Sequence, residues 1–333
     1  MYIIDDLSTA FLYNPVTVHD IRQPAYPLEQ TVLDYQRNEW GKSLRSLFQK
    51  GRYRDAYHIG KELSARFRAD PDCSQFLRWE TSLLFAKACI YFSPSSNDGL
   101  HEILRVNQEM EKELLEKPFF KRSNEERKQW LHLKGILFHL TGYDLWMNKG
   151  NLNTALKDSR LALGCYEKAG TLEEVATLHD NIGRILSLSD DREGALYEIA
   201  QGLEIRLSLG QPDRVALSYI SYADTCLRFG NIDEARQYLE QAEKICIAED
   251  NLRGIGLVSL LYGRLYRLMS NQTEYALEKR LSFLKMAVPY LEKAELIFHI
   301  LVEEPIRTKD IKEEVVDVWD ELIQIYQIMG RFA

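Results

Sequence analysis

The sequence predicts an all-α fold, a solenoid of stacked helical pairs, because several features recur at one spacing. The segment Gly150–Ala155 returns as Gly230–Ala235, and a degenerate copy, Asp190–Ala195, lies midway between them. Ala155, Ala195 and Ala235 are therefore 40 residues apart. The same step separates the small or aromatic residues Tyr143, Gly183, Ala223 and Gly263. A fixed period of this length, in units of two short amphipathic helices, is typical of a helical solenoid.

At these residues the chain resembles the tetratricopeptide repeat family. That family places a bulky residue, Leu-Gly and Tyr on the first helix of each unit, and Ala, an aromatic or aliphatic residue and a second Ala on the second helix. The matching positions are Ile182, Gly183, Leu186, Tyr219, Tyr222, Ala223 and Cys226 on first helices, and Ala235, Leu239 and Ala242 on a second helix. The resemblance implies a right-handed superhelix. The unit exceeds the family's usual length of about 34 residues, and resembles the subclass found in kinesin light chains and bacterial signalling-ATPase sensors.

Composition fits a folded solenoid. The 333 residues are 45% hydrophobic and include 18 Tyr, 13 Phe and 5 Trp, which is ample for a packed interior. The formal net charge of −8 comes from acidic and basic residues mixed throughout the chain. This mixture argues against nucleic acid as the main partner.

The N-terminal third departs from the regular period. Residues 1–30 are punctuated by Pro15, Pro24 and Pro27 and predict an irregular segment. Residues 31–122 predict divergent helical pairs. We expect helices over 29–49, 54–68, 74–92 and 100–116, a loop over 93–99, and a basic, aromatic connector over 117–123. The helix over 74–92 is apolar almost all round, which predicts deep burial.

Residues 123–333 predict the repeat superhelix. Ser123 with Glu126 fits a capping box that begins a helix running to Lys149. Thr171 with Glu174, and Asn231 with Glu234, have the same spacing and predict further helix N-termini. The regular units extend to about Met269.

The period slips near the C-terminal end. The alanine expected at position 275 is displaced, and the set Ala287, Leu291 and Ala294 comes 12 residues late. We interpret Asn271–Leu281 as an insertion that could extend a helix, and such insertions often lie at one functional edge. The last segment, Val316–Ala333, has first-helix residues and no second helix after it, so we expect a truncated end and a longer natural protein.

No sequence pattern predicts catalysis, a metal site or a cofactor. The five cysteines, Cys73, Cys89, Cys165, Cys226 and Cys246, have no metal-ligand spacing, and an odd count without secretory features favours a reducing, cytoplasmic location. His132 and His139 lie on one helical face, but no third ligand accompanies them. No apolar run approaches the roughly 18 residues of a membrane span. We expect a non-catalytic protein without membrane contact.

The resemblance implies that the concave face binds the partner, since the family lines its inner groove with the first helix of each unit. The implied partner-binding positions are Asp144, Asn148, Asp180, Arg184, Asp224, Arg228, Arg264 and Arg267. Charges of both signs suit a protein or peptide of mixed charge, because arginine can bind carboxylates in bidentate fashion. The competing interpretation is that these charges pair with one another. They do not reproduce the Lys/Asn clamp of chaperone-binding members.

The sequence therefore predicts a scaffold or sensor that recognises a protein, a peptide or another domain of the same larger protein. By resemblance, the setting is the sensor part of a bacterial signalling or defence protein. One alternative is a free-standing regulator that binds a short signalling peptide. Another is the recognition part of an enzyme whose catalytic domain lies outside this chain.

Overall fold

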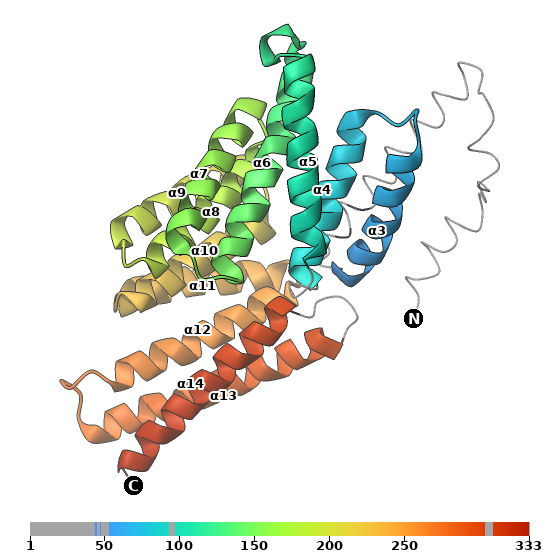
Figure 1. Ribbon diagram of the computed structural model, residues 1–333. Coiled ribbons are helices and arrows are strands. Elements are labelled where there is room, and N and C mark those ends of the chain that lie inside the picture. Colours follow the sequence, from blue (N-terminus) through green and yellow to red (C-terminus); the bar gives the residue numbers. More distant parts are fainter. Residues whose placement is uncertain (1–43, 45–46, 48–52, 93–96, 304–308, 333) are drawn as a thin grey trace. The chain divides into compact units, whose positions relative to one another are not determined.

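The computed structural model describes residues 44, 47, 53–92, 97–303 and 309–332, and all of these belong to one compact unit that begins at Leu44 (Figure 1). The predicted irregular segment 1–30 and most of the predicted helix 29–49 lie outside the described residues. Within the described ranges the secondary structure is helical throughout. The predicted all-α repeat fold is confirmed.

Twelve α-helices and one short 3-10 helix are described. They are α3 (Tyr53–Ala69), α4 (Gln75–Phe92), α5 (Asp98–Glu116), the 3-10 helix Phe119–Lys121, α6 (Asn124–Met147), α7 (Leu152–Ala169), α8 (Leu172–Leu188), α9 (Arg192–Leu209), α10 (Pro212–Arg228), α11 (Ile232–Ala248), α12 (Leu252–Ser270), α13 (Leu277–Glu303) and α14 (Lys309–Phe332). None of these helices is sufficiently long and apolar to cross a membrane.

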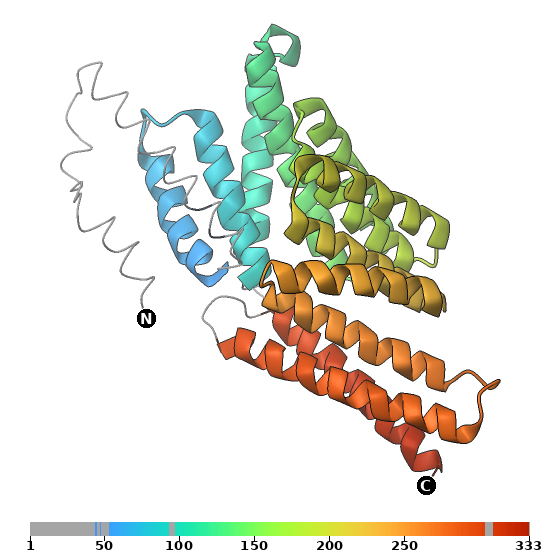
Figure 2. The same cartoon turned by 180° about the vertical axis from the view of Figure 1, so that it is seen from behind.

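The helices pack as consecutive pairs. The most extensive contacts join α6 to α7, α8 to α9, α10 to α11 and α12 to α13, and both views show these pairs following one another (Figures 1 and 2). The first helices of neighbouring pairs also touch, since α4 contacts α6, α8 contacts α10, and α12 contacts α10 and α14. This arrangement gives the repeats one face made of first helices.

Small residues allow the close packing within each pair. Ala155, Ala195 and Ala235 are fully buried. A Cβ atom added to Gly183 of α8 would lie 2.6 Å from Ile199 and 3.0 Å from the carbonyl oxygen of Ala195, both on α9. The 40-residue spacing of small residues therefore marks the points where paired helices cross.

The turns between helices also repeat. Gly150 and Gly230 adopt left-handed φ angles of 63° and 78°, and Asp190, midway between them in sequence, adopts 62°. Non-glycine residues reach this conformation at some energetic cost, and aspartate and asparagine tolerate it best. The degenerate copy of the repeat thus keeps the turn without keeping the glycine.

The predicted helix starts are confirmed, but the three N-cap residues differ in whether the side chain accepts a hydrogen bond. Ser123 and Glu126 form the full capping box. Thr171 and Asn231 occupy N-cap positions, yet neither side chain accepts a cap hydrogen bond, and Asn231 instead donates to Glu234 at 3.0 Å. The residue pattern gives the position of a helix start, whereas the bond depends on the side-chain rotamer.

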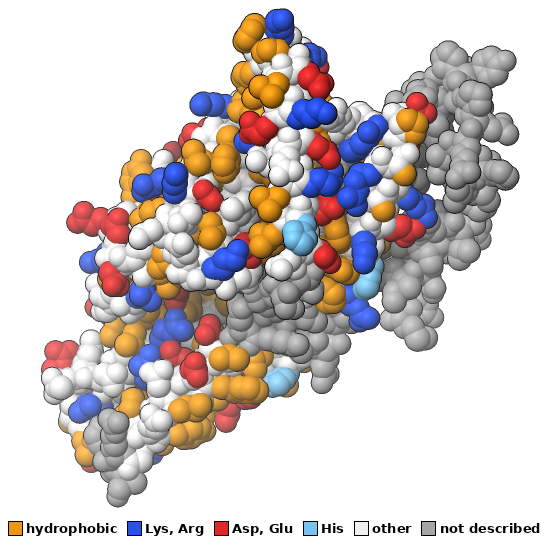
Figure 3. Space-filling view, in the orientation of Figure 1, with side chains coloured by type: hydrophobic (Ala, Val, Ile, Leu, Met, Phe, Trp, Pro, Cys, Tyr) orange, Lys and Arg blue, Asp and Glu red, His pale blue; other side chains and the backbone are white. Residues whose placement is uncertain are grey.

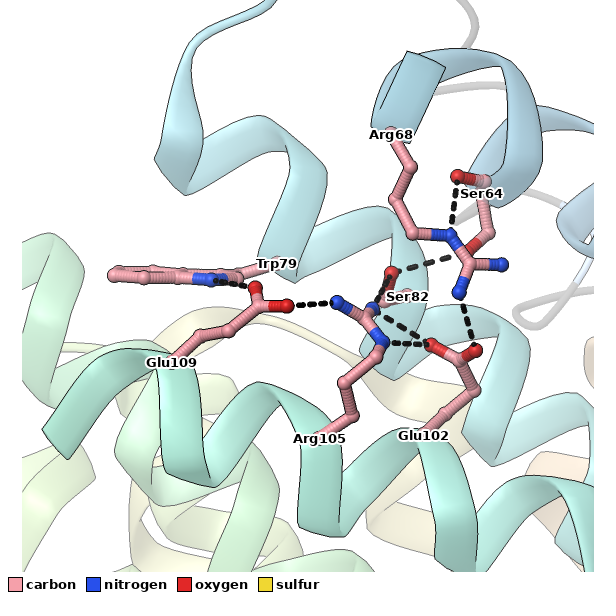
Figure 4. A network of polar contacts seen from close by, with 7 residues as sticks. All are labelled: Ser64, Arg68, Trp79, Ser82, Glu102, Arg105 and Glu109. Atoms are coloured by element: carbon pink, nitrogen blue, oxygen red, sulfur yellow. Dashed lines mark hydrogen bonds and ion pairs between the residues drawn. The ribbon is translucent and has the colours of Figure 1, made fainter. Parts of the chain in front are cut away.

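The N-terminal pairs are held by a polar network as well as by an apolar core. Helix α4 is buried over most of its length from Trp79 to Ile90, as predicted. Arg105 of α5 donates to Glu102 at 2.7 Å and to Ser82 of α4 at 2.8 Å, and Arg68 of α3 donates to Glu102 at 2.9 Å (Figure 4). The network therefore joins three helices.

The late set of small residues is explained by a longer helix. Helix α13 begins ten residues before Ala287, whereas α11 begins only three residues before Ala235. The turn before α13 is also longer, since it covers residues 271–276. Ala287, Leu291 and Ala294 are fully buried. The predicted insertion Asn271–Leu281 thus consists of the turn 271–276 and the first five residues of α13, so the predicted helix extension accounts for only part of it.

Candidate partner-binding site

A cavity of about 500 Å³ lies on the face made of first helices. Its lining comes from the C-terminal halves of α8, α10 and α12, together with the end of α6 and one residue of α14. The residues that carry charge or aromatic character are Trp146, Arg184, Asp224, Arg228, Arg264, Arg267 and Asp317. We call this space the arginine cavity.

Five of the eight predicted partner-binding residues line the arginine cavity: Arg184, Asp224, Arg228, Arg264 and Arg267. The structure brings them together from three helices that are 40 residues apart in sequence. This convergence follows from the stacking of first helices, because the same helical position recurs on the same face of each unit. Their role in partner binding remains a prediction.

Two of these arginines are already paired within the chain. Arg264 donates to Asp224 at 2.6 Å and to Glu321 of α14 at 2.9 Å. Arg267 donates to the same Glu321 carboxylate at 2.5 Å and 3.2 Å. Because the side chain of Glu321 is only 6% exposed, these bonds are shielded from solvent. Arg264 and Arg267 therefore hold α14 against α12.

The other two arginines have weaker engagements. The guanidinium of Arg184 lies over the ring of Trp146, 4.9 Å from its centroid, and has no ion pair within the described part of the chain. Arg228 lies 3.5 Å from Asp190, whose side chain is 83% exposed. An exposed pair at this distance contributes little. Arg184 and Arg228 are thus the cations of this cavity that can bind an added carboxylate.

Asp144, Asn148 and Asp180 do not line the arginine cavity. Asn148 donates to Asp144 at 2.7 Å, and Lys149 lies 2.8 Å from the same carboxylate. Asp180 is buried and bonded to Arg206 of α9 and to Ser218 of α10. For Asp144 and Asp180 the structure favours the competing interpretation, in which the charges pair within the chain: Asp144 with Lys149 just after α6, and Asp180 with Arg206 of α9.

Sequence reasoning missed Trp146 and the two acidic residues of α14, Asp317 and Glu321. Trp146 stands at the end of a predicted helix, where nothing in the repeat pattern distinguishes an aromatic residue of the core from one that stacks on arginine. Glu321 is 54 and 57 residues away from its partners. The acidic run on α14 facing a helix with Arg264 and Arg267 was the available signal.

Burial raises the thiol pKa of four cysteines, Cys89, Cys165, Cys226 and Cys246. Burial raises the pKa of the Cys226 thiol to about 12 and that of the Cys246 thiol to about 11. The thiolate is the reactive form, so these thiols behave as small apolar side chains. Among the described residues, no three His, Cys, Asp or Glu side chains are grouped to hold a metal ion.

The predicted insertion contributes to a separate cavity of about 420 Å³. Gln272, Glu274 and Tyr275 line it together with the turn Gly230–Glu234. The lengthened turn before α13 thus lies beside the turn of the preceding unit. A functional role for this edge remains a prediction.

The face of the molecule seen in Figure 3 is electrically mixed. In the view of Figure 3, basic and acidic side chains alternate over the described residues, with no broad area of one sign. Nucleic-acid binding normally needs such a basic area.

Comparison with known proteins agrees with this architecture. Residues 173–248 match the family model described as tetratricopeptide repeat. No curated protein matches the chain in sequence. These residues span α8 to α11 and include the central units of the predicted period, and they belong to the tetratricopeptide repeat family.

Two solved structures share the fold. One is the Rap conjugation gene regulator of the plasmid pLS20 in complex with the Phr* peptide, with a TM-score of 0.54, 15% identity, and coverage of 86% of this chain and 73% of that one. The other is a signal transduction ATPase with numerous domains and a tetratricopeptide repeat sensor, from Pyrococcus horikoshii. It has a TM-score of 0.50 and 14% identity, over 91% of this chain and 44% of that one. At these identities the likeness shows the fold alone.

Proposed function

We propose that the chain recognises a protein or peptide through the arginine cavity, and that an acidic group of the partner binds between Arg184 and Arg228. The observation that carries this proposal is the convergence of five predicted residues in one cavity, where two arginines have no shielded acidic partner. A carboxylate that bridges two guanidinium groups gains charge-assisted hydrogen bonds.

The aromatic wall of the cavity supports the same proposal. Trp146 holds the Arg184 guanidinium in place by stacking. A guanidinium that is fixed before binding loses less conformational freedom when the partner arrives. Asp224 and Asp317 line the same space, so a partner with a basic residue beside its acidic one fits best.

For the setting, we propose the sensor region of a larger signalling protein. The support is the shared fold with the signal transduction ATPase whose sensor is a tetratricopeptide repeat region; the chain covers 44% of that protein. A cytoplasmic location fits the five free cysteines.

A second candidate is a regulator that binds a short signalling peptide. It is favoured by the likeness to the Rap regulator, which was solved with a bound peptide, and by coverage of 73% of that protein. In both settings the chain itself performs recognition rather than a reaction. The alternative setting, an enzyme that uses this chain for recognition, differs from both because its complete reading frame would contain a catalytic motif. Sequencing that reading frame tests this.

The test is a selection from a random peptide display library with three versions of the chain. The first is the native chain, and the second carries Arg184→Glu and Arg228→Glu. The third carries Lys157→Glu and Arg160→Glu on α7, which makes the same charge change at exposed positions outside the cavity. We expect peptides with an acidic residue to be enriched by the native chain and the α7 variant, and to bind the cavity variant at least about tenfold more weakly. Peptides that bind all three versions equally contradict the proposed site.

A further inference from the structure

A second cavity of about 480 Å³ lies on the first-helix face, nearer the N-terminal ends of α8 and α10. Helices α4 and α6 contribute to its lining, together with Tyr166 of α7, Arg206 of α9 and Gln211, the N-cap residue of α10. We call it the Tyr166 cavity. It contains none of the eight predicted partner-binding residues, and its volume is in the range of roughly 300–1,000 Å³ that is usual for small-molecule sites.

Tyr166 is built into the wall of this cavity. Its side chain is 1% exposed, and its ring lies against Gly135 of α6, where an added Cβ would be 2.6 Å from the ring carbons. The rings of His132 and His139 flank it, with centroids 5.7 Å and 6.3 Å away. The two histidines are seven residues apart and match no metal motif in the sequence. Their spacing instead allows both rings to pack against Tyr166.

The hydroxyl of Tyr166 has no hydrogen-bond partner among the residues that the structure describes. This oxygen is not among the fully buried side-chain atoms of the described residues that lack a partner, so it keeps contact with open space. Since Tyr166 lines the cavity, this hydroxyl is available to a bound molecule as donor or acceptor.

A fixed polar pair stands beside it. Asn181 of α8 donates to Nε2 of His139 at 3.2 Å. Burial, with a contribution from the nearby Lys87 charge, lowers the pKa of His139 to about 3. The imidazole is therefore neutral near pH 7 and accepts a hydrogen bond from Asn181. The charges of the cavity therefore come from residues other than His139.

Charges of both signs face this space. Lys87 of α4 and Arg214 of α10 line it together with Glu80 of α4 and Glu174 of α8. Burial lowers the pKa of Lys87 to about 8, and Glu174 opposes that shift. A partly desolvated amine gains from an added carboxylate. Leu84, Ile136 and Leu140 supply an apolar wall in the same cavity.

We propose that the Tyr166 cavity binds a small zwitterion with an apolar side chain, a free amino acid or a dipeptide. The ligand carboxylate binds at Lys87 and Arg214, with the Tyr166 hydroxyl as an additional donor. Its ammonium group binds at Glu80 and Glu174, and its side chain packs against Leu84, Ile136 and Leu140. A site lined by equal numbers of both charges disfavours a simple anion or cation and favours a molecule that carries both.

This inference does not rest on the proposed function of the arginine cavity. On α8 the two cavities use different turns, because Glu174 and Asn181 line the Tyr166 cavity and Arg184 and Leu188 line the other. The solenoid would then have two separate binding sites, one for a small molecule and one for a protein or peptide.

The test is isothermal titration calorimetry of the full chain at pH 7 with each of the common free amino acids and with L-leucyl-L-leucine. The matched control ligand is N-acetyl-L-leucinamide, which has the apolar side chain and neither charge. We expect at least one zwitterion to bind and the capped compound to bind at least about tenfold more weakly. Lys87→Met is expected to weaken binding more than about tenfold, and Tyr166→Phe about three- to tenfold.

The cavity variant Arg184→Glu with Arg228→Glu serves as the control protein and is expected to bind the zwitterion as the native chain does. Unchanged circular dichroism and thermal unfolding of Tyr166→Phe exclude misfolding, and Lys87→Gln provides a second, polar replacement. The absence of binding heat for every zwitterion overturns the proposal. Equal binding of the capped compound also overturns it, since the charges would then have no role.

Discussion

The regular repeats and the N-terminal pairs differ in how regularly their helix–helix contacts recur along the sequence. In α8 and α9 the crossing point is made by Gly183 and Ala195, where backbone and apolar side chains approach closely. In α3, α4 and α5 the joint is the polar network of Arg68, Glu102 and Arg105 (Figure 4). Both regions contain close crossings, since a Cβ added to Gly99 of α5 would lie 3.0 Å from the carbonyl oxygen of Ala86 on α4. Only the crossings of the regular repeats recur at a fixed spacing among the described residues, and the N-terminal pairs add a polar network across three helices.

This difference explains why one region has a visible period and the other does not. A close crossing requires a small residue at one fixed helical position, so each repeat must show it at the same spacing. An ion pair can be made from many positions by long, flexible side chains, and Arg68 reaches Glu102 across 34 residues. The positions of the polar network are therefore less constrained in sequence than the small residues of a close crossing.

The largest effect is expected from filling a crossing point. Gly183→Leu would place side-chain atoms against Ile199 and the Ala195 carbonyl, and we expect it to lower the free energy of unfolding by about 3 kcal/mol. Gly164 is the control, because a Cβ added there meets nothing within 4 Å. Gly164→Leu should be neutral or slightly stabilising, since leucine is the better helix former. Urea denaturation of the two variants measures the contrast, and equal destabilisation would show that the crossing is not tight.

The next largest loss of stability is expected from breaking the polar network of Arg68, Glu102 and Arg105. Arg105→Met leaves Glu102 and Glu109 without a shared cation, and the Glu102 side chain is only 12% exposed. Because Arg105 is itself partly exposed, we expect a loss of about 2 kcal/mol rather than the larger loss seen for fully buried pairs. Arg66→Met removes an exposed pair with Glu62 on α3 and should change the free energy of unfolding by less than about 0.5 kcal/mol. Similar losses for both variants in urea denaturation would contradict a special role for the network.

The sequence predicts the repeats well and the site only in part, for the same physical reason. The 40-residue step locates Gly183 and Ala195, and even the turn at Asp190, whose φ of 62° preserves the glycine conformation. It also places Arg184 and Arg228 on one face. It does not show that Arg264 and Arg267 are bound by Glu321, because that contact depends on how α14 packs against α12 and on which rotamers result. Helical periodicity carries the positions of side chains and not their partners.

A pH dependence tests the border between the two regions, where α6 contacts α4. Burial lowers the pKa of His139 to about 3, whereas an unfolded histidine titrates near about 6.5. Between these values the unfolded chain binds the additional proton, so folding stability falls as the pH decreases. We expect the contribution of His139 to fall by up to about 1.4 kcal/mol per pH unit below pH 6. Urea denaturation at pH 7, 6 and 5 should show this slope in the native chain and a shallower one in His139→Gln. Parallel slopes would mean that the imidazole is accessible to protons in the folded chain.

The smallest effect distinguishes two helix starts that look alike in the sequence. The side chain of Asp191 accepts a hydrogen bond from the backbone N–H of Gly194 at 2.9 Å, while Thr171 makes no such bond to α8. Asp191→Ala should therefore lower the free energy of unfolding by about 1 kcal/mol, because it removes both the cap and a negative charge at the N-terminus of α9. Thr171→Ala removes only a 3.5 Å bond to the Tyr166 carbonyl and should cost less than about 0.5 kcal/mol. Equal losses of unfolding free energy for the two variants would mean that the Thr171 side chain caps α8 in solution. The residue pattern would then predict both capping bonds as well as both helix starts.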